Sequence, residues 1–246
     1  MALLHSFESD GNWLFKRRGW LPVFLFVLAV PVIFLTDYSS VSDDQKLITG
    51  AIAVAVSFIG QWIRAYTVGT TPKGTSGRNT EEQVAESLNS TGIYSVVRHP
   101  LYLGNYLMWI GIVIYTLNWY FVIIVSLMYW LYYERIMFAE ERFLERKFGK
   151  AYLDWSLKAP AFVPRLSQFV KSAIPFSMIT VLRREYTGVL NTVLGFLFVD
   201  VLRYYATHGE YKFFMWQGYV LGATVLMALL LRTLKKSGKL NEEGRS

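Results

Sequence analysis

The stretch that decides the fold is LYLGNYLMWIGIVIYTLNWYFVIIVSLMYWLYY, residues 101–133, which contains no charged residue. A helix needs roughly 20 mainly apolar residues to cross the hydrocarbon core of a bilayer, so this stretch is long enough for two spans. Asn118 lies near its middle and is the expected break between them. The stretch therefore predicts a hairpin of two membrane helices.

Four further apolar runs flank this hairpin, at residues 20–36, 47–66, 186–205 and 213–234. Hydrophobic residues make up 53% of the chain and charged residues 17%, whereas a soluble domain carries about 25% charged residues. The alternative is a soluble helical bundle, but six such runs would leave too little polar surface for solubility. We therefore predict an all-α, polytopic integral membrane bundle with about six transmembrane helices.

Lysine and arginine are distributed unevenly between the two sides of these runs. They gather before the first run, between the second and third, after the fourth and after the sixth, and the opposite segments hold only Lys46 and Lys212, with Arg203 near the end of the fifth run. Positive loops stay in the cytoplasm. We expect cytoplasmic termini and a cytoplasmic loop 69–92, in a bacterial inner membrane more than in the endoplasmic reticulum. The net charge of +7 then faces anionic lipid, so a nucleic-acid partner is not expected.

The chain contains no cysteine, which excludes disulfides, thiolate catalysis and cysteine metal sites. His5, His99 and His208 are too few and too scattered for a histidine metal cluster, so no metal site is expected. The first apolar run follows basic residues but lacks a small-residue cleavage site. It is expected to be a retained span and not a removed signal peptide.

Three shorter segments suggest structure outside the membrane. Residues 80–88 could form a short helix capped by Thr80, with Gln83 three residues later as in a capping box. Residues 134–155 keep a helical periodicity before two prolines break it, and the short apolar segment 169–178 could lie along the interface.

The most informative segment for chemistry is GIYSVVRHPLYLGN, residues 92–105. Pro100 suits the first turn of a helix, so the third span is expected to begin there. The positive helix end and Arg98 would then converge into an anion site. The alternative reading of Arg98 is a plain topology anchor at the membrane surface.

Beyond Pro100 the third span has two different faces. One face is polar and aromatic: Tyr102, Asn105, Tyr106 and Trp109. The other carries Gly104, Met108 and Gly111, where a neighbouring helix could approach closely. Aromatic rings could hold a cation such as a sulfonium, although an interfacial aromatic belt would have the same composition.

The segment 134–152 has a charge pattern that does not stabilise a helix by itself. Glu134, Glu141 and Glu145 share one face, and Arg135, Arg142 and Arg146 share the next. Like charges four residues apart disfavour a helix, so we expect partners outside this helix. Ribose hydroxyls and an amino group would suit the acids, and an anion would suit the arginines. An ordinary charged surface helix is the alternative.

These two segments together resemble the isoprenylcysteine carboxyl methyltransferase family and its phospholipid methyltransferase relatives. The first motif, Arg-His-Pro-x-Tyr-x-Gly, is carried here by Arg98, His99, Pro100, Tyr102 and Gly104. The second is carried by Glu140, Glu141, Leu144, Phe148, Gly149 and Tyr152. Pro160 and Pro164 resemble the family's closing prolines, and Gly60, Arg64 and Gly69 a weaker upstream pattern, so the likeness covers residues 60–165.

The resemblance implies a methyltransferase that uses S-adenosylmethionine and acts on a lipid or lipid-anchored acceptor at the cytoplasmic face. The residues implied to bind the cofactor are His99, Tyr102, Gly104, Asn105, Glu140, Glu141 and Tyr152. Those implied to be catalytic are Arg98, Glu141 and Arg142. The chain would divide into N-terminal spans 1–59, a methyltransferase core 60–165, and a C-terminal part 166–246 whose two spans the resemblance does not explain.

The acceptor is expected to be a carboxylate or phosphate, methylated on oxygen, because arginines are concentrated near the implied site: Arg98, Arg135, Arg142, Arg146, Arg183 and Arg184. Phospholipid N-methylation, an NADPH-dependent membrane reductase of related fold and a non-enzymatic membrane protein are the alternatives. Gly218 and Gly222 form a small-x-x-x-small pair, which leaves a homodimer possible.

Overall fold

The computed structural model describes residues 2–75 and 83–245. The regular secondary structure of this part of the chain consists of helices and one isolated bridge between Gly92 and Val170, and the connections are turns and irregular segments. Its α-helices are α1 (Ala2–Arg17), α2 (Leu21–Leu35), α3 (Asp43–Gly69), α4 (Pro100–Ile114), α5 (Trp119–Phe148), α6 (Lys150–Ser156), α7 (Met178–His208) and α8 (Met215–Lys236). Two short 3-10 helices, η1 (Ile93–Ser95) and η2 (Leu166–Gln168), lie in the connections.

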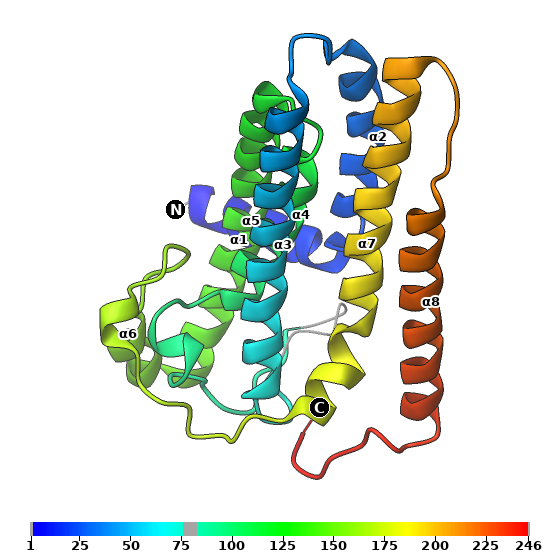
Figure 1. The fold of residues 1–246 in the computed structure, drawn as a ribbon. Coiled ribbons are helices and arrows are strands. Elements are labelled where there is room, and N and C mark those ends of the chain that lie inside the picture. Colours follow the sequence, from blue (N-terminus) through cyan, green and yellow to red (C-terminus); the bar gives the residue numbers. More distant parts are fainter. Residues whose placement is uncertain (1, 76–82, 246) are drawn as a thin grey trace.

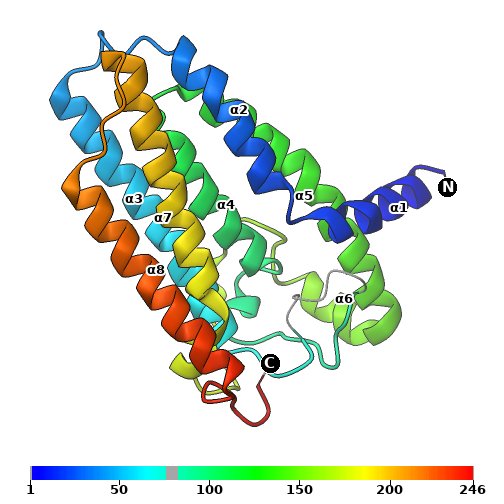
Figure 2. The same ribbon diagram turned by 90° about the vertical axis from the view of Figure 1, so that its right-hand side faces the viewer.

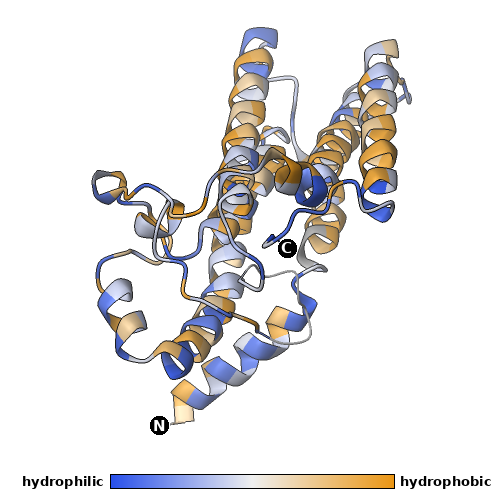
Figure 3. Ribbon diagram, turned by 90° about the horizontal axis from the view of Figure 1, so that it is seen from below, coloured by the Kyte–Doolittle hydropathy of each residue, from blue (hydrophilic) through white to orange (hydrophobic). Residues whose placement is uncertain are grey.

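The predicted membrane bundle is confirmed. Helices α3, α5, α7 and α8 are long and apolar enough to cross a bilayer, and α2 and α4 are shorter apolar helices of 15 residues each. These six helices, which correspond to the six predicted runs, lie side by side, while α6 and the loops around it gather at one end (Figure 1). Viewed from that end, hydrophobic residues cover the long helices, α1 carries both hydrophilic and hydrophobic residues, and the C-terminal tail is largely hydrophilic (Figure 3).

The predicted hairpin is also present. Pro100 begins α4, and Asn118 separates α4 from α5 by capping α5: its side-chain oxygen accepts a hydrogen bond from the Phe121 amide at 2.9 Å. Helix α5 then continues to Phe148 without a break, beyond its apolar part. It ends because Gly149 has a φ of 53°, a left-handed value that favours glycine.

The small face of α4 packs on α3, as the sequence predicted. A Cβ added to Gly111 would lie 2.1 Å from Ser57 Oγ and 2.5 Å from the Ala53 carbonyl oxygen. One turn earlier along this contact, Ser57 donates a hydrogen bond to the Met108 carbonyl at 2.8 Å. Only glycine permits an approach this close, which brings the polar side chains of α3 next to those of α4.

Helix α1 is not among the predicted elements because it has no long apolar run. It leaves the bundle and packs along the lower part of α5 (Figure 2). Phe15 is buried there, and a Cβ on Gly11 would lie 2.1 Å from the Arg135 carbonyl oxygen, so the two helices are in close contact.

Three features differ from the sequence-based expectation. The helix expected to run to residue 155 is interrupted at Gly149, and α6 follows it. Helix α7 begins at Met178, eight residues before the predicted run, because Ser177 caps it and accepts a hydrogen bond from the Thr180 amide. The apolar segment 169–178 contains no helix before Met178, and its position along the interface stays a prediction. Residues 83–88 are not helical, and the rest of the expected short helix lies outside the described residues.

Candidate functional site

The segment before α4 is held in place by the segment that carries the closing prolines. The Arg98 amide donates to the Pro160 carbonyl at 2.8 Å, and the His99 amide donates to the Ala161 carbonyl at 3.2 Å. The Arg165 amide donates back to the Val96 carbonyl at 2.9 Å. These backbone contacts fix the positions of two consecutive polar side chains just ahead of the helix.

Arg98 and His99 both reach the same carboxylate on α5. Arg98 Nε lies 2.8 Å and its second terminal nitrogen 3.2 Å from the two oxygens of Glu141, and His99 Nε2 lies 2.8 Å from Glu141 Oε1. The remaining terminal nitrogen of Arg98 donates to the carbonyls of Ser156 and Ala159. The two family motifs, separated by the membrane hairpin, therefore meet at one charged cluster.

A second carboxylate, Glu140, lies beside the first. It accepts a hydrogen bond from the Tyr102 hydroxyl at 2.7 Å, and its Oε2 lies 3.7 Å from His99 Nδ1. The Tyr102 ring packs against the Tyr133 ring with centroids 4.7 Å apart. His99, just before α4, and Tyr102 in its first turn thus contribute an imidazole and a phenol next to the acidic side chains of α5.

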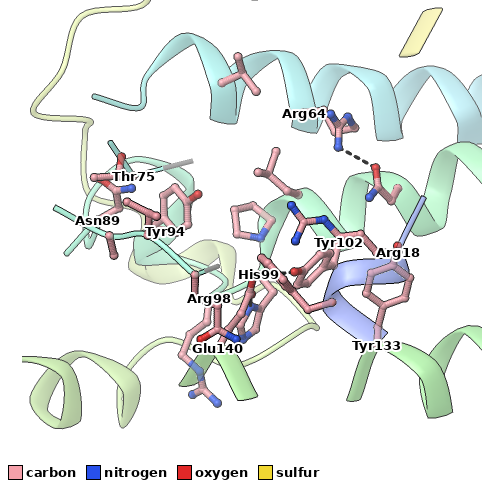
Figure 4. A pocket seen from close by; sticks show the side chains of 18 of the residues that line it. Arg18, Arg64, Thr75, Asn89, Tyr94, Arg98, His99, Tyr102, Tyr133 and Glu140 are labelled. Atoms are coloured by element: carbon pink, nitrogen blue, oxygen red, sulfur yellow. Dashed lines mark hydrogen bonds and ion pairs between the residues drawn. The ribbon is translucent and has the colours of Figure 1, made fainter. Parts of the chain in front are cut away.

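These groups open into a cavity of about 770 Å³. Figure 4 shows Arg98, His99 and Glu140 on one side of it, with Tyr102 and Tyr133 further along. Most of the residues that the sequence implied for the site line this cavity: Arg98, His99, Tyr102, Asn105, Glu140, Glu141 and Tyr152. The structure therefore gathers seven of the nine residues around one space.

Gly104 and Arg142 are not among the lining residues. Gly104 faces α3, where an added Cβ would lie 2.5 Å from Arg64 Cγ, so its role is to allow the helices to approach. Arg142 forms an ion pair of 2.6 Å with Glu145 on its own helix. A direct catalytic contact of Arg142 is not supported by this arrangement.

The arginines expected beside the acceptor are divided between two places. Arg98 and Arg184 line the cavity. Arg146 instead pairs with Glu8 of α1 at 2.6 Å, and Arg135 lies 4.0 Å from Asp10 of α1. The partners of these two arginines are therefore acids of the same chain, which the sequence pattern alone did not reveal.

Sequence reasoning did not assign several residues that line the same cavity: Arg18, Arg64, Tyr94, Trp155, Glu185, Gly188 and Asn191. Three of these belong to α7, the first of the two spans left unexplained. A glutamate and two arginines at the start of an apolar run were the available signal, because an ionisable residue in a spanning helix usually has a specific partner.

Two tyrosines that line the cavity and lie outside the spanning helices have raised pKa values. Burial, with the neighbouring Glu140 carboxylate, raises the pKa of Tyr94 to about 12. Burial and the Glu141 carboxylate raise the pKa of Tyr152. Both hydroxyls therefore stay protonated at neutral pH and can act as hydrogen-bond donors to a ligand.

Comparisons with known proteins show which proteins this chain is similar to. A family model described as phospholipid methyltransferase matches residues 46–151. The chain is 30% identical to the nickel-cobalt-cadmium resistance protein NccN of Alcaligenes xylosoxydans xylosoxydans over 161 residues, which cover 63% of this chain and 69% of NccN. It is 29% identical to the cobalt-zinc-cadmium resistance protein CzcN of Cupriavidus metallidurans over 162 residues, which cover 64% of this chain and 68% of CzcN.

A shorter match is to an enzyme. The chain is 31% identical to the protein-S-isoprenylcysteine O-methyltransferase of Schizosaccharomyces pombe over 77 residues, which cover 31% of this chain and 33% of that protein. No solved structure matches the chain.

Proposed function

We propose that this chain, which belongs to the phospholipid methyltransferase family, uses S-adenosylmethionine to methylate a lipid or lipid-anchored acceptor at the cytoplasmic face of the membrane. The observation that carries the proposal is the cluster in which Glu141 binds both Arg98 and His99 at the edge of the cavity. The apolar helices embed the protein in a membrane, so a membrane-anchored acceptor can reach this cavity without leaving the bilayer.

The lining of the cavity suits S-adenosylmethionine. Its volume of about 770 Å³ lies within the usual range of roughly 300–1,000 Å³ for small-molecule sites. Carboxylates such as Glu140 can accept hydrogen bonds from ribose hydroxyls and from an ammonium group, and Arg98 can bind a carboxylate. The rings of Tyr102 and Tyr133 pack together with centroids 4.7 Å apart and both line the cavity, where they can stabilise a positively charged sulfur.

When bound, S-adenosylmethionine supplies a methyl group on a cationic sulfur, and its transfer to an anionic oxygen breaks one carbon–sulfur bond, forms one carbon–oxygen bond and cancels both charges without proton transfer. The protein's part is therefore to position the reactants and exclude water. Glu141 orients Arg98 and His99, and the buried aromatic side chains keep the surroundings dry. No strong base is required.

An acceptor with a phosphate or carboxylate suits the charges of the cavity better than an amine does. Among the described residues, the cavity is lined by four arginines, Arg18, Arg64, Arg98 and Arg184, and by three glutamates, Glu140, Glu141 and Glu185. Arginine matches the geometry of phosphate and carboxylate oxygens. An ammonium acceptor would also have to lose a proton before it could be methylated.

The test is to express the chain, incubate the membranes with S-adenosylmethionine labelled in its methyl group, and identify the labelled product. We expect the label in a lipid or in a lipidated protein. Membranes that contain the Glu141→Gln variant should give no labelled product. Purified protein that binds NADPH but not S-adenosylmethionine would contradict the proposal and favour a reductase.

A further inference from the structure

A second polar cluster lies in the same cavity, on the side formed by α3 and α7. Arg64 Nε and one terminal nitrogen lie 2.9 and 2.8 Å from the two carboxylate oxygens of Glu185, and its other terminal nitrogen donates to Asn105 Oδ1 at 2.7 Å. The amide of Gln61 also donates to Glu185 at 3.0 Å. Figure 4 shows Arg64 extending from α3, across the pocket from Arg98 and Glu140.

Stability alone does not explain this cluster. Charged side chains within membrane helices are costly, and a buried ion pair is often no more stabilising than apolar residues of the same size. Here the pair joins two apolar helices, and Glu185 has a side chain only 4% exposed. An ionisable pair that lines a cavity between such helices is best explained by a ligand.

Arg64 is the member of the pair that faces the cavity, since its side chain is 21% exposed and that of Glu185 is 4% exposed. A guanidinium has five N–H donors. Within the described structure, Glu185 accepts hydrogen bonds from Nε and one terminal nitrogen of Arg64, and Asn105 accepts one from the other terminal nitrogen. These contacts fix the plane of the guanidinium, so its other donors are already oriented to bind an anion.

The cavity extends along α7 beyond this pair, to Gly188 and Asn191. Gly188 follows Glu185 by one turn of α7, and a Cβ added to it would lie 3.5 Å from Glu185 Oε2 and 3.6 Å from Met108 Cε. These are ordinary van der Waals distances. Gly188 and Asn191 both line the cavity, so a larger side chain at residue 188 would extend into the space next to Arg64.

We propose that Arg64 binds the phosphate or carboxylate of the membrane-anchored methyl acceptor, and that Glu185 is a positioning residue that orients its guanidinium. This inference rests on the proposed function, because it divides the cavity into a cofactor side at Arg98 and Glu141 and an acceptor side at Arg64. It gives α7, which lies outside the matched region 46–151, a role in recognising the acceptor.

The first test measures binding, without turnover. Full-length protein purified in a neutral detergent is titrated with dodecyl phosphate, with inorganic phosphate and with S-adenosylmethionine. The variant replaces both members of the pair by amides, Arg64→Gln with Glu185→Gln, so that no buried charge is left alone. The matched control is Arg146→Gln, which removes one arginine paired with Glu8 outside the cavity.

We expect the double variant to bind dodecyl phosphate at least tenfold more weakly than the wild type and the control, since a hydrogen bond to a charged group contributes roughly 1.5–3 kcal/mol. S-Adenosylmethionine should bind all three proteins equally. Unchanged affinity of the double variant for dodecyl phosphate would overturn the assignment. Loss of both ligands would overturn the division of the cavity, and equally tight binding of inorganic phosphate would show a site for free anions.

A second variant keeps the charged pair and fills the space. Gly188→Leu should weaken dodecyl phosphate binding and leave S-adenosylmethionine binding unchanged, with Gly188→Ala as the size control.

In a methyl-transfer assay on vesicles made from the host's lipid extract, Glu185→Gln should raise the apparent KM for lipid and change kcat by less than about threefold. Equal changes in both constants would contradict a positioning role.

The two proposals can fail separately. If the wild type transfers no methyl group to any lipid, the proposed function is wrong, and the dodecyl phosphate titration still decides whether Arg64 binds an anion.

Discussion

Glu141 binds Arg98 through both carboxylate oxygens, at 2.8 and 3.2 Å, and the oxygen nearer to Arg98 Nε also lies 2.8 Å from His99 Nε2. One carboxylate on α5 therefore orients two consecutive side chains that precede α4. These two side chains come from the first family motif and the carboxylate from the second. Any cofactor held by this cluster depends on Glu141 even where it does not contact that residue.

Glu141→Gln should accordingly lower the affinity for S-adenosylmethionine at least tenfold. The substitution keeps the size of the side chain but removes the charge that orients Arg98 and His99, and charge-assisted hydrogen bonds contribute roughly 1.5–3 kcal/mol each. His99→Ala should have a similar effect. The measurement is equilibrium binding to the purified protein, with Glu145→Gln as control because Glu145 pairs with Arg142 away from the cavity lining. Wild-type affinity in Glu141→Gln would refute the site.

Gly111→Ala should destabilise the bundle. Its Cβ would lie 2.1 Å from Ser57 Oγ and 2.5 Å from the Ala53 carbonyl, and overpacking of this kind costs about 1–3 kcal/mol. The readout is the thermal unfolding midpoint in detergent. Gly222→Ala on α8 is the control, since no atom lies within 4 Å of its added Cβ, and it should be neutral or slightly stabilising. Equal midpoints for the two variants would contradict the close packing of α3 on α4.

Gln217 should be required for the attachment of α8 to α7. It is fully buried, donates to Asp200 Oδ2 at 2.6 Å and accepts from the Phe214 amide at 2.7 Å. Gln217→Leu removes both contacts, which should cost about 1–3 kcal/mol because the remaining polar atoms lose their partner. Thr224→Val, on an exposed face of α8, is the control. A midpoint that does not change in Gln217→Leu would argue against this attachment.

Both termini and the loop 69–92 should be cytoplasmic, by the positive-inside rule. The chain has no cysteine, so single cysteines at Ser90 and at Glu210, in the connection between α7 and α8, can be labelled with an impermeant maleimide in intact cells. Glu210→Cys should react from outside, and Ser90→Cys only after the cells are opened. The reverse pattern would invert the proposed orientation.

The methyl group should be found on oxygen. The labelled lipid from the transfer assay is treated with mild base and analysed by mass. A carboxyl methyl ester should release methanol, and a phosphate methyl ester should appear as a head group with one negative charge fewer. Label that resists base and resides on an amine nitrogen would disprove the expectation that arginines select an anionic acceptor.

The membrane bundle could be predicted from the sequence because a bilayer requires long apolar helices, and these helices appear as apolar runs. Pro100 and Asn118 also marked the ends of the hairpin helices correctly. Helix α1 and the first turns of α7 were not predicted, because their charged residues interrupt any long apolar run, and such segments are typical of loops. In the structure α1 packs on α5, and Glu185 of α7 is neutralised by Arg64 of α3.

The cluster around Glu141 could also be predicted, because its residues belong to two local motifs of recognisable order. Which arginines face the cavity was decided only by the tertiary structure. Arg146 is turned toward Glu8 of α1, whereas Arg64 and Glu185, 121 residues apart, meet beside the cavity because α3 and α7 pack together. The sequence of one helix shows which cationic residues it carries. The partner of each of them depends on which helix packs next to it.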